Sequence, residues 1–191
     1  MSFEETIIHC CAPSLCGIKP ACLFSMRTDC FNSGRDKIAE WKLFFSKQKK
    51  YFVPLRKEKD RILFFVYDRV LLEKVLSQKS SVSYLKSKGY PVSKGFDACL
   101  ALLLHRLMFL SDFPHEVGLF LGYPLDDVIG FELQTGSNCI YSGFWKVYSD
   151  MDRAVKMMNM YKACSEKCMK LLNRGLSVPL VTYKYISSLE A

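Results

Sequence analysis

The sequence predicts an α+β protein in which helices cover a small antiparallel sheet of about four strands. Two apolar segments, 51–55 and 62–67, flank a charged turn at 57–60 and indicate a β-hairpin. Much of the remaining chain has the apolar spacing of amphipathic helices, most clearly over 150–173. Strands and helices therefore fall in separate stretches, which is typical of α+β proteins.

Length and composition favour one domain with a substantial hydrophobic core. The chain has 191 residues, of which 50% are hydrophobic and 24% are charged, a balance typical of globular proteins. No segment repeats at a fixed period, and no low-complexity linker divides the chain. We therefore expect a single domain over residues 1–175, followed by a C-terminal extension over 176–191.

The apolar segments predict a soluble cytoplasmic protein. The longest apolar stretch, 98–104, is far shorter than the roughly 20 residues that a membrane-spanning helix needs. The N-terminal segment has Glu4 and Glu5 where a secretory signal would have basic residues before an apolar run. Nine cysteines without such a signal argue for free thiols, because the cytoplasm keeps thiols reduced.

The N-terminal part of the chain is expected to alternate helix and strand. Residues 3–11 suit a short helix that ends at Pro13, and 21–26 suit a short strand. The polar triplet 32–34 predicts a loop. An amphipathic helix that includes Trp41 follows this loop.

The middle of the chain predicts the hairpin and then several helices. Pro54 cannot donate a ladder hydrogen bond, so it places the first hairpin strand at an edge or a bulge. Helices are expected around 70–75 and 82–88. The segment 96–110 is apolar on nearly every side and is expected to be the central buried helix.

The last third predicts helix, strand, helix and strand in turn. Asp112 is a candidate cap for a helix with Pro114 in its first turn. Large residues on both faces of 139–148 predict a strand, and 150–173 predicts a long helix. The extension contains a strand-like segment at 178–186.

Two groups of cysteines bear on metal chemistry. The densest cluster of soft ligands consists of His9, Cys10 and Cys11, with Cys16 and Cys22 following. It is a candidate metal or haem site, although free cysteines are commonly small buried hydrophobes. Cys164 and Cys168 share a helix face, but their spacing with apolar residues assigns them to the buried seam of that helix. No Cys-x-x-Cys motif occurs, which excludes the usual zinc-ribbon and thioredoxin patterns.

His115 and Glu116 are the candidate acid–base pair. They are expected in the first turn of a helix, where a histidine and a carboxylate can exchange protons or bind a metal. The zincin pattern requires a second histidine where this chain has Leu119, so that mechanism is excluded. The alternative is structural, because an acid at a helix start interacts favourably with the helix dipole.

Basic residues are concentrated in one region of a chain whose net charge is +8. Residues 35–94 contain 16 Lys and Arg against 6 Asp and Glu. The lysines around the predicted hairpin are a candidate docking surface for an acidic protein: Lys47, Lys49, Lys50, Lys57 and Lys59. Nucleic acid is disfavoured because no recognition-helix or zinc-finger pattern accompanies these residues. Within 95–135 the one basic residue, Arg106, has three candidate partners: Asp97, Asp112 and Glu116.

Three stretches form longer motifs. They are CAPSLCGIKPACLF at 11–24, FPHEVGLFLGYPLDDVIGF at 113–131 and GFWKVYSD at 143–150. Together they resemble an uncharacterised family of small proteins from anaerobic, clostridial-type bacteria, a domain of unknown function. The resemblance covers about residues 5–170 and implies no activity. It implies a weak link to redox or iron physiology and makes a flavodoxin-type carrier the expected acidic partner.

The resemblance also singles out positions by motif. They are Pro13, Gly17, Lys19, Pro20, His115, Glu116, Gly122, Tyr123, Pro124, Asp127, Trp145 and Tyr148. The chain departs from the family at Cys16 and Cys22, where alanine and a small residue are expected. The resemblance therefore argues against a thiol-ligand role for these two cysteines.

The leading hypothesis is a binding or accessory protein with a small-ligand pocket where three segments converge. Its candidate ligand-binding residues are Lys19, Pro20, His115, Glu116, Tyr123, Trp145 and Tyr148. A metal- or haem-binding redox protein that uses His9 or His115 with nearby thiols is one alternative. An acid–base enzyme that uses His115 and Glu116 is another. The cofactor, the substrate and the presence of catalysis are left open.

Overall fold

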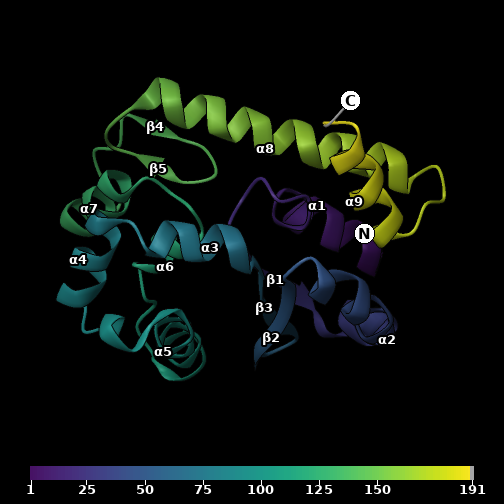
Figure 1. The fold of residues 1–191 in the computed structure, drawn as a ribbon, viewed down its shortest axis with the longest axis horizontal. Helices are drawn as coiled ribbons and strands as arrows, with labels where there is room; N and C mark the ends of the chain where they lie inside the picture. The colour runs from purple at the N-terminus through teal and green to yellow at the C-terminus, as the bar shows by residue number, and fades with distance from the viewer. Residues whose placement is uncertain (190–191) are drawn as a thin grey trace. The chain divides into compact units, whose positions relative to one another are not determined.

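The computed structural model of the chain consists of two compact units, drawn in Figure 1. The structure describes residues 1–189, without the side chains of 56–58. The first unit comprises Met1–Leu71 and Met160–Ala191, and the second comprises Leu72–Asn159. Helices dominate and the strands form small antiparallel sheets, so the predicted α+β class is confirmed. The single domain predicted for 1–175 stays a prediction.

The first unit is built on a three-stranded antiparallel sheet. Its elements are α1 (Phe3–Leu15), β1 (Ala21–Arg27), α2 (Thr28–Lys47), β2 (Lys50–Glu58), β3 (Arg61–Asp68), the second half of α8 (Met151–Leu172) and α9 (Val178–Ser187). The strand order is β1-β3-β2. The predicted hairpin is therefore confirmed, and Pro54 lies in the edge strand β2 as expected, next to a shift in the β2–β3 register.

Helices α1, α2, α8 and α9 enclose the core of the first unit together with the sheet. The buried residues include Ile7 and Ile8 of α1, Phe45 of α2, Phe64 and Val66 of β3, and Val178 and Val181 of α9. A capping box between Ser2 and Glu5 starts α1. The predicted end of this helix at Pro13 is wrong, because the helix runs on to Leu15. Packing of α1 against the sheet outweighs the local effect of the proline near its last turn.

The loop predicted at 32–34 is wrong, because α2 begins at Thr28 directly after β1. Gly34 lies inside this helix and is buried against the ring of Phe3. A Cβ atom at Gly34 would overlap that ring. The glycine therefore serves the close approach of α1 to α2, which local sequence propensity does not reveal.

We expect Gly34→Ala to lower the free energy of unfolding by about 1–3 kcal/mol, although alanine favours helix by about 1 kcal/mol. The overlap with Phe3, which is 2% exposed, forces one of the two helices to move. Urea denaturation measures the change. Asn32→Ala, at an exposed position of the same helix, is the control and is expected to leave stability nearly unchanged. A Gly34→Ala protein more stable than the wild type would contradict this account.

The second unit is mainly helical. Its elements are the end of α3 (Arg69–Leu76), α4 (Lys79–Ser87), the 3-10 helix η1 (Val92–Lys94), α5 (Phe96–Phe109), α6 (Val117–Phe120), α7 (Leu125–Gln134), β4 (Tyr141–Ser142), β5 (Lys146–Val147) and the first half of α8. The helices predicted around 70–75 and 82–88 and the long helix over 150–173 are confirmed.

Three predictions for the second unit are wrong. The α5 helix is not the central buried helix, because it is buried along one side only and Phe109 is 66% exposed. The buried residues of α5 are Cys99, Leu100, Leu103 and Leu107. The helix expected from Asp112 is the single turn α6, which begins later. The strand predicted over 139–148 is a tight hairpin of two short strands. Large residues on both faces there reflect a chain that reverses at Gly143, rather than a strand buried on two sides.

The strand-like segment 178–186 is the helix α9, so that prediction is also wrong. Ser177 occupies the N-cap position, and Pro179 lies in the first turn, where a missing amide hydrogen is tolerated. Val178, Val181 and Tyr185 are buried at helical spacing, which outweighs the strand propensity of the β-branched residues. Among the described residues, no helix is long and apolar enough to cross a membrane.

Candidate metal centre

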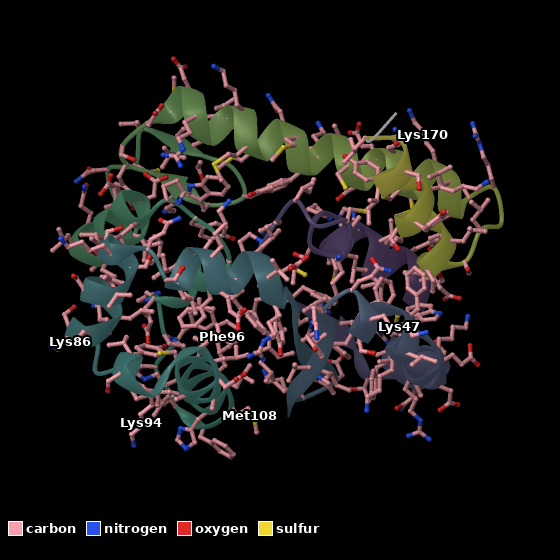
Figure 2. All side chains as sticks on the ribbon, in the orientation of Figure 1. Lys47, Lys86, Lys94, Phe96, Met108 and Lys170 are labelled. Atoms are coloured by element: carbon pink, nitrogen blue, oxygen red, sulfur yellow. The ribbon has the colours of Figure 1, made fainter. Side chains whose placement is uncertain are left out.

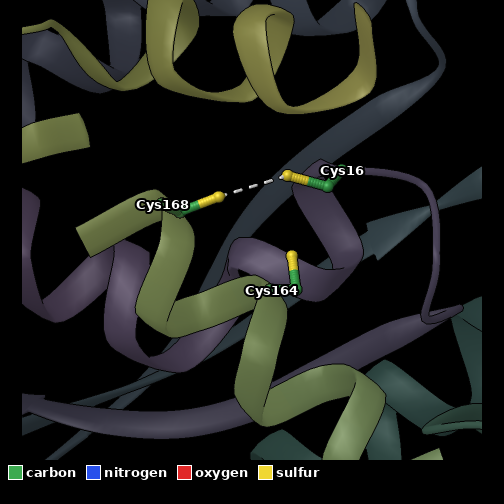
Figure 3. A group of neighbouring side chains, drawn as sticks. All are labelled: Cys16, Cys164 and Cys168. Atoms are coloured by element: carbon green, nitrogen blue, oxygen red, sulfur yellow. Dashed lines mark hydrogen bonds between the residues drawn. The ribbon is translucent and has the colours of Figure 1, made fainter. Parts of the chain in front are cut away.

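Three cysteine side chains meet in the core of the first unit. Cys16 follows α1 as its C-cap, and Cys164 and Cys168 lie one turn apart on α8. The three sulfur atoms lie within 4.8 Å of one another, and Sγ of Cys16 is 3.6 Å from Sγ of Cys168. Figure 3 shows the three side chains pointing toward a common space. We call these residues the three-cysteine group.

Local structure positions each member of the group. Gly17, with a φ of 75°, turns the chain sharply after α1. The backbone after the turn is hydrogen-bonded to the end of α1, since Ile18 N donates to Pro13 O at 2.9 Å. Cys164 and Cys168 project from the buried side of α8, since residues four apart share a helix face. Cys16 is 4% exposed, and the two α8 cysteines are fully buried.

The sulfur positions match the size of a single metal ion. Zinc–sulfur bonds of about 2.3 Å place tetrahedral ligands about 3.8 Å apart and trigonal ligands about 4.0 Å apart. The 3.6 Å separation of Cys16 and Cys168 is close to both values. Among the described residues, this is the one group of three or more Cys, His, Asp or Glu donors close enough to share an ion.

Hydrogen bonding makes the three thiols unequal. Thiols of Cys16 and Cys168 donate to Cys164 and lower the pKa of Cys164 to about 4, against the opposing effect of burial. Tyr185 and Lys167 act in the same direction. The pKa of Cys16 is raised well above its ordinary value by its hydrogen bonds to Cys164 and Cys168, and by burial. Hydrogen bonding therefore favours ionisation of Cys164 over ionisation of Cys16.

The third thiol, Cys168, has opposing influences. The contact with Cys16 lowers the pKa of Cys168, but the hydrogen bond to Cys164 and burial raise it to about 12 overall. A thiolate is the form of cysteine that binds metals, so Cys164 is already in its binding form. Cys16 and Cys168 must each release a proton before all three sulfurs can act as thiolate ligands.

The metal ligands predicted from the sequence lie elsewhere. His9 is exposed on α1, and Cys10 is half-buried, with its pKa raised to about 11 by burial. Cys11 is buried on the same helix and hydrogen-bonds Cys22 rather than the three-cysteine group. His115 belongs to the second unit. None of these four residues is part of the group that can share an ion among the described residues.

Glu116 is held by a structural network rather than by His115. It is 6% exposed and accepts hydrogen bonds from Arg106 Nη1 at 2.5 Å and from Tyr90 Oη at 3.0 Å. One of the three partners predicted for Arg106 is thereby confirmed. His115 is exposed and its ring packs against Phe131, with ring centroids 5.0 Å apart. Both residues precede α6 in a turn, so their predicted place in the first turn of a helix is wrong.

Two of the predicted pocket residues donate hydrogen bonds to one carboxylate, and a third packs against one of them. The rings of Tyr123 and Trp145 stack with centroids 4.8 Å apart. Trp145 Nε1 donates to Asp127 at 2.8 Å, and the amide of Tyr148 donates to the same side chain at 2.8 Å. Asp127 thus ties the β4–β5 hairpin to α7. These contacts give Tyr123, Trp145 and Tyr148 structural roles in the second unit.

Lys19 and Pro20 belong to the first unit, whereas the other predicted pocket residues belong to the second. Lys19 Nζ lies 5.5 Å from the ring centre of Tyr161, and burial lowers the pKa of this lysine. The convergence of all three segments on one ligand stays a prediction.

The predicted basic surface is only partly formed by exposed lysines. Lys47, Lys49 and Lys59 are exposed, and Figure 2 shows Lys47 on the first unit. Lys50 is buried and pairs with Asp68 at 3.4 Å, so it does not contribute to such a surface. The side chain of Lys57 lies outside the described residues. Docking of an acidic protein here stays a prediction.

The fold and the site together define an α+β protein with a buried group of three thiols. The chain belongs to the family described as "Protein of unknown function (DUF3793)", whose family profile matches residues 7–182. The resemblance to an uncharacterised family is therefore confirmed, and the match extends into α9, beyond the predicted limit near 170. No curated protein and no solved structure matches the chain.

Proposed function

We propose that the protein binds one thiophilic metal ion through Cys16, Cys164 and Cys168. The observation that carries this proposal is the placement of three sulfur atoms within 4.8 Å of one another in a buried core. Cysteine thiolates are soft ligands that favour copper(I) and zinc over hard ions such as Mg²⁺ or Ca²⁺. The proposal keeps the metal-binding alternative drawn from the sequence but replaces its ligands.

An ion at this site links parts of the chain that are far apart in sequence. Cys16 and Cys168 are separated by 152 positions, and each lies on an element that packs in the core of the first unit. Because the ligands come together only in the folded chain, the free energy of metal binding adds to the stability of the fold. We therefore propose a role in which the ion holds the end of α1 against α8.

The first test is metal analysis of protein refolded under reducing, oxygen-free conditions with Cu(I), Zn²⁺ or Cd²⁺ alone. Refolding is used so that each ion is present while the three cysteines come together. We expect about one equivalent of at least one of these ions to be retained after chelator washing, with a higher midpoint of thermal unfolding. Failure of all three ions to be retained would overturn the proposed function.

Substitution of a ligand tests which residues hold the ion. We expect Cys164→Ser to weaken binding by about a hundredfold or more, since even partners of metal ligands contribute 10–100-fold. The matched control is Cys99→Ser, which changes a buried cysteine of α5 in the second unit and is expected to leave affinity unchanged. Circular dichroism confirms that each variant folds. Equal losses in both variants would contradict the assignment of the ligands.

A further inference from the structure

The three-cysteine group supplies sulfur ligands alone. Among the described residues, no histidine or carboxylate lies with these sulfurs in a shared group. Zinc in structural sites takes four ligands from Cys, His, Asp and Glu. Since the three cysteines are 4%, 0% and 0% exposed, bulk water does not reach a fourth position. The donor set therefore suits an ion that is satisfied by three soft ligands.

The spacing of the three sulfur atoms also favours a single metal ion over an iron–sulfur cluster. Three cysteines of an iron–sulfur cluster bind at least two different iron atoms, so their sulfurs do not all lie as close together as sulfurs that share one metal. The three sulfurs here lie within 4.8 Å of one another, and Sγ of Cys16 is 3.6 Å from Sγ of Cys168. Copper(I), which prefers thiolate and thioether ligands and accepts three of them, fits this spacing and number best.

A methionine extends the soft ligands from the core to the surface. Met160 precedes Cys164 by four residues on α8, so the two side chains are neighbours on one helix face, about 6 Å apart along the axis. Met160 is 45% exposed, whereas Cys164 is fully buried. A thioether binds copper(I) but is not among the usual ligands of zinc. An exposed soft donor thus lies one turn from the buried thiolate.

We infer that the three-cysteine group selects copper(I) over zinc and that Met160 is the surface ligand from which the ion passes to Cys164. This inference rests on the proposed function. The ion keeps its charge of +1 throughout, and no electron is transferred. The Met160 thioether first binds the incoming ion, and the Cys164 thiolate then replaces it. Cys16 and Cys168 complete the site as their protons pass to the buffer.

Competition experiments test the selection of copper. Wild-type protein is titrated without oxygen against a coloured Cu(I) chelator and, separately, against a coloured Zn²⁺ chelator. We expect one equivalent of Cu(I) to bind at least about a thousandfold more tightly than Zn²⁺, because zinc lacks its fourth ligand here. Comparable affinities for the two ions would overturn copper selection and leave the proposed function standing. Failure of Cu(I), Zn²⁺ and Cd²⁺ alike to bind would overturn both copper selection and the proposed function.

Loading kinetics test the role of Met160. Met160→Leu keeps an apolar side chain of similar size and removes the sulfur, so we expect Cu(I) uptake to slow by about tenfold with equilibrium affinity unchanged. Met151→Leu is the matched control, because Met151 is 44% exposed at the other end of the same helix. Uptake by Met160→Leu at the wild-type rate would overturn the role of Met160. A loss of equilibrium affinity would instead make it a permanent ligand and overturn its role as a transfer ligand.

Discussion

Replacing Asp127 with alanine is expected to lower the free energy of unfolding by about 3–5 kcal/mol. Asp127 is 2% exposed and accepts hydrogen bonds from Trp145 Nε1, the amides of Tyr148 and Ser149, and Ser149 Oγ, at 2.8–3.0 Å. Alanine leaves these donors without their acceptor. Such buried donors retain their desolvation penalty, so the loss exceeds that of an exposed hydrogen bond.

The neighbouring acid provides the control for this experiment. Asp126 lies in the same first turn of α7 but is exposed, so Asp126→Ala is expected to cost less than about 1 kcal/mol through the helix dipole alone. Urea denaturation is followed by the fluorescence of Trp145 in a Trp41→Phe background, since the chain has 2 tryptophans. Similar losses for both substitutions would show that the hydrogen bonds at Asp127 contribute little.

Local pattern predicted the elements whose packing agrees with their propensity. The hairpin of β2 and β3 and the long helix α8 are examples, because their apolar spacing and their turn or cap residues favour the same structure. The predictions failed where packing overrides local preference. Gly34 lies within α2 rather than in a loop, because only a residue without a side chain fits against the ring of Phe3. The β-branched residues of α9 are helical because they pack into the core of the first unit.

The candidate site was only partly predictable for a related reason. Helical spacing placed Cys164 and Cys168 correctly on the buried seam of α8, but their partner Cys16 is 152 positions away from Cys168. Local spacing carries no information on such a contact. The sequence did contain a pair of cysteines four residues apart, in a chain with nine free cysteines. A metal site built on this pair needs a third thiol, and the sequence does not indicate which cysteine supplies it.

Some polar residues that were predicted to bind a ligand have structural roles instead. Glu116 and Trp145 have the residue types of a ligand pocket, yet each uses its polar atoms within the second unit. A sequence shows which side chains can donate or accept but not which of them are already paired. Buried polar groups are usually paired, so an isolated Glu or Trp in a motif is a weak indication of a ligand.

The affinity of the three-cysteine group for its ion is expected to rise about a hundredfold for each pH unit between pH 6 and 8. The sign follows from the protons that bind in competition with the metal. Cys16 and Cys168 have raised pKa values and are protonated in this range, so each releases one proton on binding. The pKa of Cys164 is lowered to about 4, so this sulfur is already a thiolate and releases none.

Cu(I) titrations against a chelator of known pH dependence measure this slope directly. Two released protons give a slope near two in a plot of the logarithm of affinity against pH, and Cys99→Ser is expected to give the same slope as the wild type. A slope near three would show that Cys164 is a thiol before binding and that its hydrogen bonds from Cys16 and Cys168 do not hold a thiolate. A slope near zero would show that binding displaces no thiol protons, which would contradict the raised pKa values of Cys16 and Cys168.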